Sequence, residues 1–170
     1  FNVLAPGWRS CKSCPDLDAR LEISRLAPIT NIGEPFYFGR EEIGRKEFLL
    51  DGWAPYGEAW GNWSEGQVAA MLLPIPDPRP KNLKLLVRAF VHEKHPKQDV
   101  EIFINGSFQK RISLSEFENN QIDLQLPSSV FNSDYLKLEF KMLNPASPKA
   151  LGISDDDRLL GIGAISVVFN

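Results

Sequence analysis

The sequence is poor in cysteine, in histidine and in net basic charge. Its 170 residues include 2 Cys and 2 His, so a zinc site made of two Cys pairs is excluded. The formal net charge is -3. Nucleic-acid binding needs clustered Lys and Arg against phosphate, so this balance argues against a nucleic-acid partner. An uncharged polar partner fits the composition better.

Long apolar runs and helical periods are also missing. The longest apolar stretches, such as "LLGIGAISVVF" at the C-terminal end, are well short of the ~20 residues that span a bilayer. No segment keeps a helical period of apolar residues over a dozen positions. The chain begins with Phe rather than Met, and we therefore expect a processed product or a part of something longer.

Alternating apolar residues are abundant instead, and this pattern is typical of half-buried strands. In "LKLLVRAFV" (83–91) every second residue is apolar, and "DVEIFING" (99–106) ends on Asn-Gly, the strongest short signal for a hairpin. Further strands are predicted at 19–26, 34–39, 46–53, 66–75, 108–114, 121–127, 134–142 and 161–169. Short strands at this spacing predict an all-β fold, a two-sheet antiparallel sandwich of the jelly-roll kind. We expect a single sandwich domain over residues 19–170, preceded by an N-terminal extension over residues 1–18.

That extension contains the motif "CKSC", in which Cys11 and Cys14 are separated by two residues. A redox motif of this type normally opens a helix in a βαβ unit, and no such unit is predicted. A local disulfide and a pair of free thiols both remain open, and a disulfide would imply an oxidising compartment.

The stretch "DGWAPYGEAWGNWSEG" (51–66) holds three of the four Trp. Flat aromatic rings suit the apolar C–H faces of sugars, and carboxylate, amide and hydroxyl groups can bond sugar hydroxyls. A cluster of core rings is the alternative, because Trp buries a large area. The candidate ligand-binding residues here are Trp53, Tyr56, Glu58, Trp60, Asn62, Trp63 and Glu65.

A second polar motif, "GISDDDRLLGIG" (152–163), carries three consecutive carboxylates and an arginine. Asp155, Asp156 and Asp157 are candidate calcium ligands, although the EF-hand spacing is absent. The simpler interpretation is a polar turn in which Asp156 or Asp157 pairs with Arg158, which we add to the ligand-binding candidates. No other metal or cofactor is indicated.

Catalytic motifs are few. Glu58 and Glu65 are the one pair that resembles the two carboxylates of a glycosidase, and the sequence does not give their separation. The segment "HEKH" (92–95) is one residue shorter than the zinc-protease motif and precedes a Pro, as in a solvated turn.

Taken together, the two motifs resemble a β-sandwich accessory domain of bacterial envelope-polysaccharide proteins, which occurs attached to membrane glycosyltransferases and phosphoglycerol-transferase-like enzymes. The residues that carry the resemblance are Gly52, Trp53, Glu58, Trp60, Gly61, Trp63, Ser64 and Gly66 in the first motif, and Ser147, Pro148, Leu151, Gly152, Ser154, Asp156, Arg158 and 160–163 in the second. It covers about residues 19–170.

The resemblance implies a non-catalytic domain that faces the cell envelope on its periplasmic or extracytoplasmic side. Its partners would be a polysaccharide or oligosaccharide and the rest of a larger membrane-associated enzyme. The first functional hypothesis is therefore carbohydrate recognition. A scaffolding domain that packs on its own membrane enzyme and a small glycosidase are the alternatives.

Overall fold

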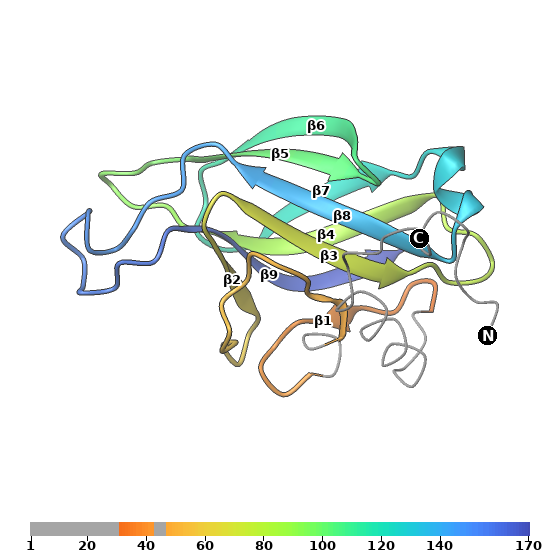
Figure 1. Ribbon diagram of the computed structural model, residues 1–170, viewed down its shortest axis with the longest axis horizontal. Coiled ribbons are helices and arrows are strands. Elements are labelled where there is room, and N and C mark those ends of the chain that lie inside the picture. The colour runs from red at the N-terminus through yellow and green to blue at the C-terminus, as the bar shows by residue number, and fades with distance from the viewer. Residues whose placement is uncertain (1–30, 43–46) are drawn as a thin grey trace, which may run out of the picture.

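Two antiparallel β-sheets stacked face to face make up the part of the chain described by the computed structural model, residues 31–42 and 47–170 (Figure 1). One sheet has the order β1-β9-β4-β7, with β2 also paired to β9, and the other has the order β3-β8-β5-β6. The strands are β1 (Phe36–Tyr37), β2 (Asn62–Glu65), β3 (Val68–Pro74), β4 (Asn82–Ala89), β5 (Gln98–Ile104), β6 (Ser107–Leu114), β7 (Asn120–Gln125), β8 (Tyr135–Met142) and β9 (Leu160–Phe169). A short 3-10 helix, Ser128–Asn132, joins β7 to β8.

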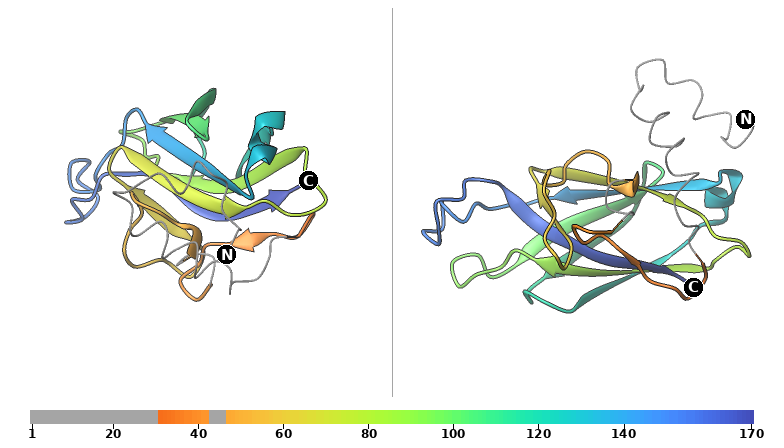
Figure 2. Two further views of the ribbon diagram at one scale, coloured as in Figure 1. Left: turned by 45° about the vertical axis from the view of Figure 1, so that its right-hand side comes forward. Right: turned by 90° about the horizontal axis from the view of Figure 1, so that it is seen from below.

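The strand order is that of a jelly roll. Strands β2, β4, β7 and β9 lie in one sheet and β3, β5, β6 and β8 in the other, so that β2-β9-β4-β7 faces β3-β8-β5-β6, with every neighbouring pair antiparallel. The predicted all-β two-sheet sandwich is confirmed. Figure 2 shows the two layers from the side and from below, with the long segment between β8 and β9 extending past the end of the sheets.

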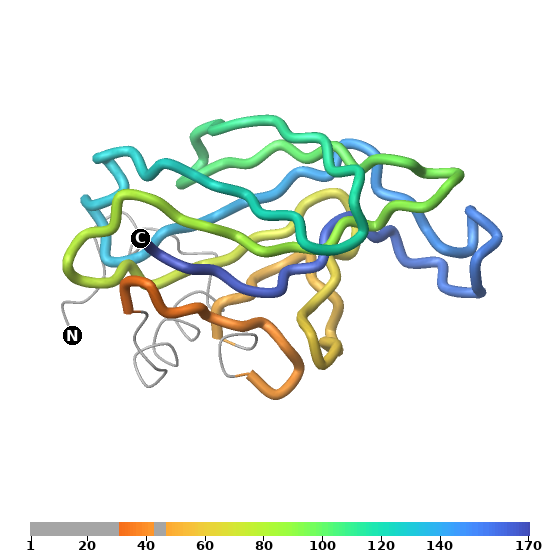
Figure 3. The backbone as a smooth tube through the Cα atoms, turned by 180° about the vertical axis from the view of Figure 1, so that it is seen from behind, coloured from red at the N-terminus to blue at the C-terminus, as the bar shows by residue number. Residues whose placement is uncertain are grey.

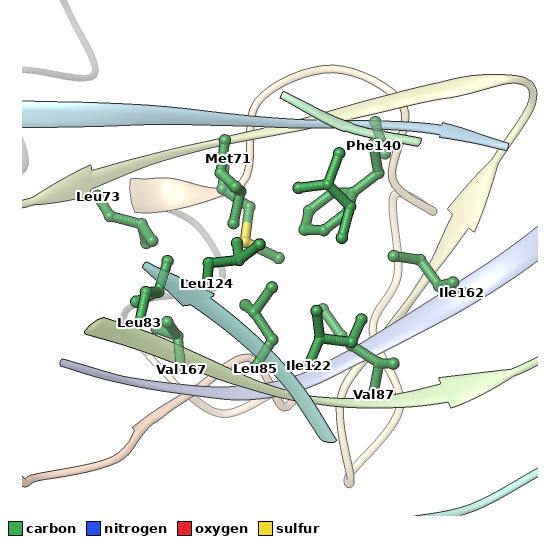
Figure 4. Packing of buried hydrophobic residues seen from close by; sticks show 14 of the residues in the cluster. Met71, Leu73, Leu83, Leu85, Val87, Ile122, Leu124, Phe140, Ile162 and Val167 are labelled. Carbon is green, nitrogen blue, oxygen red and sulfur yellow. The ribbon is translucent and has the colours of Figure 1, made fainter. Parts of the chain in front are cut away.

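The period of two in the sequence produces the core. Leu83, Leu85 and Val87 on β4 turn inward, while the residues between them turn outward. On β8, Leu138 and Phe140 face them from the other sheet. Figure 4 shows Leu83, Leu85 and Val87 pointing into the space between the two layers, toward the side of Phe140. Burial of this apolar area is the main stabilising term of the sandwich.

The predicted hairpin at Asn105-Gly106 is confirmed. Both residues have a positive φ, 48° and 83°, which is what a tight turn of this type requires. The turn joins β5 to β6, which pair over their whole length.

The expected strand over 46–53 is wrong for the described residues 47–53. Leu49 and Trp53 form isolated bridges with Met71 and Ser64, and residues 47–48 are helical. By contrast, β2 lies inside the Trp-rich stretch 51–66, at residues where no strand was predicted. The expected strand at 19–26, the boundary of the extension at residue 18, and Cys11 and Cys14 all lie outside the described residues. Among the described residues, no helix is long and apolar enough to cross a membrane.

Candidate functional site

The Trp-rich stretch begins at a sharp bend that fixes Trp53 against the sandwich. Gly52 has φ 88°, and a Cβ there would lie 1.9 Å from the carbonyl oxygen of Val68, so only glycine fits. The indole Nε1 of Trp53 donates to the carbonyl of Ala70 at 2.8 Å. Its ring meets Phe140 edge-on at 6.1 Å between centroids. Trp53 is thus a half-buried anchor of the loop.

Beyond this anchor, a row of residues crosses three strands on the outer face of the first sheet. Trp63 on β2 is paired with Gly163 on β9, which is paired with Arg88 on β4. Figure 3 shows β9 (blue) lying beside β4 (yellow-green), with the loop that leads into β2 (yellow) below it. Gly163 lacks a side chain, and the ring of Trp60 fills the space above it.

Four side chains form one packed cluster over this row: Trp60, Trp63, Arg88 and Phe117. The rings of Trp60 and Trp63 meet edge to face, 5.2 Å between centroids. The guanidinium carbon of Arg88 lies 4.1 Å from the ring centroid of Trp60 and 5.5 Å from that of Phe117. Trp60 and Trp63 are therefore only partly exposed, and part of the Trp60 ring is already covered by a cation.

Two rings of this region are more accessible. Tyr56, in the loop before β2, is 84% exposed, and Phe117, which packs against Trp63, is 42% exposed. Arg88 also donates from Nη2 to Oε1 of Glu118 at 2.7 Å. We use the name aromatic ledge for Tyr56, Trp60, Trp63, Phe117 and Arg88.

Two polar side chains of the loop are structural. Asn62 is buried and its amide donates to the carbonyl of Ala54 at 3.1 Å. Ser64 is fully buried and its Oγ accepts from the backbone N–H of Ile162 at 3.0 Å. Asn62 therefore holds the shape of the loop, and we leave it out of the set of ligand contacts below.

The two sequence motifs meet in space. Gly66 N donates to the carbonyl of Leu159 at 2.8 Å, and Glu65 is paired with Leu160 across β2 and β9. This contact brings Glu65 close to Arg158, the last charged residue before β9. The exposed carboxylate of Glu58, in the loop before β2, also lies near enough to act on Arg158 through its charge.

Arg158 is bound tightly to its own turn. Its Nε donates to Oδ1 of Asp156 at 3.0 Å and its Nη2 donates to Oδ2 at 2.7 Å. These bonds raise the pKa of Arg158, and the charges of Glu65 and Glu58 raise it further. The same bonds lower the pKa of the Asp156 carboxyl.

The calcium candidates are not brought together as a ligand set. Asp155 and Asp157 are exposed, whereas Asp156 binds Arg158. Among residues 31–42 and 47–170, no three His, Cys, Asp or Glu side chains converge in a way that could hold a metal ion. His92 and His95 pair with each other across a tight turn, as the solvated-turn interpretation of "HEKH" requires.

Arg88, Phe117 and Glu118 were missed by the sequence reasoning. Arg88 interrupts the apolar strand "LKLLVRAFV" at an outward position, which is the one signal that could have drawn attention to it. Which rings lie over its guanidinium depends on the order of strands in the sheet, and the sequence pattern does not give that order.

The amino-acid sequence of this domain matches a known protein family. Residues 36–169 match the family described as "Domain of unknown function (DUF7024)". The chain belongs to this family. No curated protein matches the chain by sequence.

Solved structures with a similar fold are remote in sequence. The chain is similar to a CBM35 from Cellvibrio japonicus Abf62, at 15% identity and TM-score 0.46, covering 79% of this chain and 93% of that one. It is also similar to a family 35 carbohydrate binding module from Clostridium thermocellum, at 9% identity and TM-score 0.46, covering 79% and 98%. A third match, at 9% identity and TM-score 0.43, is a family two carbohydrate esterase from Clostridium thermocellum in complex with cellohexaose. This match covers 81% of the present chain but only 31% of the esterase. We base the fold on the strand order itself.

Proposed function

We propose that this domain is a non-catalytic carbohydrate-recognition module that binds a polysaccharide or oligosaccharide at the aromatic ledge. The observation that carries the proposal is the half-exposed ring of Phe117 packed against the Trp60–Trp63 pair, with the exposed ring of Tyr56 in the loop that leads into β2. Rings of this kind offer flat faces to the C–H side of a sugar ring.

The neighbouring carboxylates supply the polar half of such a site. Glu58 and Glu65 lie close to Arg158, at the junction of the two motifs. Carboxylate oxygens accept hydrogen bonds from sugar hydroxyls, and each such bond to a charged group contributes about 1.5–3 kcal/mol when well formed. Apolar faces beside a few polar groups are the usual composition of a small-molecule site.

Stacking on a few partly exposed rings suits a polymer better than a free monosaccharide. A stacked ring contributes about 1 kcal/mol beyond its buried area, or about a 5-fold change in affinity. Weak contacts of this size become effective when a polymer offers many copies of the same unit.

Substitution of the exposed rings tests the proposal. Titration of the chain with envelope oligosaccharides, followed by calorimetry, should show binding that is lost in the double variant Tyr56→Ala, Phe117→Ala at unchanged thermal stability. Phe108→Ala is a matched control, because Phe108 is 57% exposed and lies on β6 of the other sheet. Equal binding by the double variant and the parent chain would refute the ledge as the site.

We further propose that the domain serves a larger membrane-associated enzyme of envelope polysaccharide synthesis, on the periplasmic or extracytoplasmic side. The support is the resemblance of its two motifs to accessory domains of glycosyltransferases and phosphoglycerol-transferase-like proteins. Fusion of the chain, within its parent protein, to a reporter that is active only in the periplasm or to one that is active only in the cytoplasm tests the location. The periplasmic reporter should be active, and fractionation of the bacterium should recover the fusion outside the cytoplasm.

A scaffolding role is the second candidate. Ile153 and Leu159, in the segment that extends past the sheets, are 47% and 43% exposed and could pack on another part of the parent enzyme. The double variant Ile153→Ser, Leu159→Ser should then lower the yield of assembled enzyme without changing glycan binding. Unchanged assembly would rule this role out.

A glycosidase role would need Glu58 and Glu65 as acid and base. If a preparation of the chain releases reducing sugar from any of the oligosaccharides, the variants Glu58→Gln and Glu65→Gln should abolish the release. Release that persists in both variants would exclude this pair as the catalytic carboxylates.

A further inference from the structure

Around the aromatic ledge, in the part of the chain that the structure describes, two positively charged side chains are paired with carboxylates, whereas two negatively charged side chains are not paired. Arg88, which belongs to the ledge, and Arg158, in the turn before β9, are each bound to a carboxylate at 2.7 Å. Glu58 and Glu65 have no ion-pair partner among the described residues. The region therefore combines two neutralised cations with two uncompensated anions.

Arg88 is closed to an anionic ligand by its packing. Its Nη2 donates to Glu118, and its guanidinium carbon lies 4.1 Å from the ring centroid of Trp60 and 5.5 Å from that of Phe117. Within the described part of the chain, its Nε is buried and has no hydrogen-bond partner, so a ligand cannot reach that donor. A sugar carboxylate would have to displace Glu118 to gain the charged hydrogen bond from Nη2.

Arg158 is closed in a different way. Two of its donors are held by both oxygens of Asp156, in the side-on geometry that gives the strongest pairs. The charges of Glu65 and Glu58 also act on Arg158, and Glu65 lies close to it because β2 pairs with β9 at Leu160. A third arginine, Arg40, whose backbone N–H donates to the carbonyl of Glu58, has an exposed side chain that lies 3.9 Å from the carboxylate of Glu41.

Because Arg88 and Arg158 are occupied by Glu118 and Asp156, and the carboxylates of Glu58 and Glu65 have no ion-pair partner in the described part of the chain, we propose that the ledge selects glycans without carboxylate or phosphate groups, and rejects acidic polysaccharides. This inference rests on the proposed carbohydrate-recognition function and narrows it to one charge class. Neutral sugars satisfy Glu58 and Glu65 through hydroxyl donors. Sugar amines satisfy them through charge as well, whereas uronates and phosphates meet repulsion at both positions.

The expected discrimination follows from Coulomb's law. One carboxylate about 7 Å from a sugar carboxylate in water changes the affinity about 3-fold at low salt, and two such charges change it about 10-fold. Salt at 0.5 M screens charges beyond about 4–5 Å, so most of the discrimination should vanish there. Binding of neutral glycans should be nearly independent of salt.

Matched pairs of oligosaccharides test the inference on the full chain. Cello-oligosaccharides are compared with oligosaccharides of the same backbone oxidised at C6 to the uronate, and galactan with galacturonan oligosaccharides. Chitosan oligosaccharides supply the amine. In each pair the neutral or amine-bearing member should bind about 10-fold more tightly in 20 mM salt, with the difference lost in 0.5 M salt.

Two variants separate charge from shape. The double variant Glu58→Gln, Glu65→Gln keeps the outline of both side chains and removes their charge. Neutral glycans and uronates both lose the charged hydrogen bonds, but only uronates are relieved of repulsion, so the ratio of neutral to uronate affinity should fall about 10-fold. Glu118→Gln frees Arg88 and should also favour the uronate, which gives an independent reading if the first variant misfolds.

The outcomes are distinct. Preferential binding of uronates by the unmodified chain, with an affinity that falls as salt rises, overturns the inference and leaves the carbohydrate-recognition function standing. Binding of none of these oligosaccharides at millimolar concentration overturns both.

Discussion

Replacement of Gly163 by Ala probes the packing on which the aromatic ledge depends. A Cβ at this position would lie 2.4 Å from Cη2 and 2.8 Å from Cζ3 of Trp60, and 3.2 Å from Cε3 of Trp63. Non-bonded carbon atoms prefer about 3.5–4.0 Å, so the Trp60 ring must move by about 1 Å or more. Arg88, 4.1 Å from the ring centroid, opposes that movement from one side.

The substitution Gly163→Ala should lower the free energy of unfolding moderately and the affinity for glycans strongly. Gly163 is in a strand and has no positive φ, so Ala is accepted by the backbone and the whole penalty comes from the contact. Overpacking of this size costs about 1–3 kcal/mol. We expect urea unfolding to show a loss in this range with an unchanged slope, since the unfolded surface is the same. Glycan binding should fall because the ledge is displaced.

A second substitution makes the test specific. Phe at position 60 lacks the outer atoms of the indole that would meet the new Cβ, so the double variant Gly163→Ala, Trp60→Phe should be more stable than the sum of the single effects predicts. This coupling is the quantity that a double-mutant cycle measures. If Gly163→Ala changes stability by less than about 0.5 kcal/mol and shows no coupling to Trp60→Phe, the packing of Trp60 over Gly163 is refuted.

Three further substitutions test the supports of the site. Trp53→Phe removes the hydrogen bond to Ala70 and should cost about 0.5–1.5 kcal/mol in chemical unfolding, whereas Trp53→Ala should cost about 3–5 kcal/mol because the packing is lost too. Ser64→Ala leaves a buried backbone N–H of β9 without its acceptor and should cost about 1–3 kcal/mol; a loss below 0.3 kcal/mol would contradict this role. Asp156→Asn tests how stability depends on pH at the acid end. Because the pKa of Asp156 is lowered in the folded state, the Asp156 carboxylate stabilises the fold above its unfolded pKa of about 4, and this stabilisation is lost as pH falls through the folded pKa. The variant should therefore be less stable than the parent at pH 7, and the two unfolding curves should converge toward pH 2.

The sequence by itself determined the class of fold. Strands such as 83–91 and 99–106 alternate apolar and polar residues, and this period survives because each strand has one face in the core. The turn at Asn105-Gly106 was also readable, since few residues other than these accept a positive φ at both turn positions. These are local features, and local rules are enough to predict them.

The stretch that contains Trp60 and Trp63 was only half readable. The sequence indicated many rings close together, but not that Trp63 lies on a strand. A segment as short as Asn62–Glu65 forms a strand because β9 offers an edge to pair with, and its own pattern is too brief to show it. Pairing with β9 also buries Asn62, which sequence reasoning had placed among the ligand contacts.

The composition of the site was decided by the tertiary structure alone. Arg88 reaches Trp60 because β9 lies between β2 and β4, and because Gly163 leaves the space in which the indole rests. Phe117 and Glu118 join them from the connection before β7, which pairs with β4. These contacts depend on how strands far apart in the sequence are ordered within a sheet, and that order is set by the packing of the whole sandwich and not by any short stretch of residues.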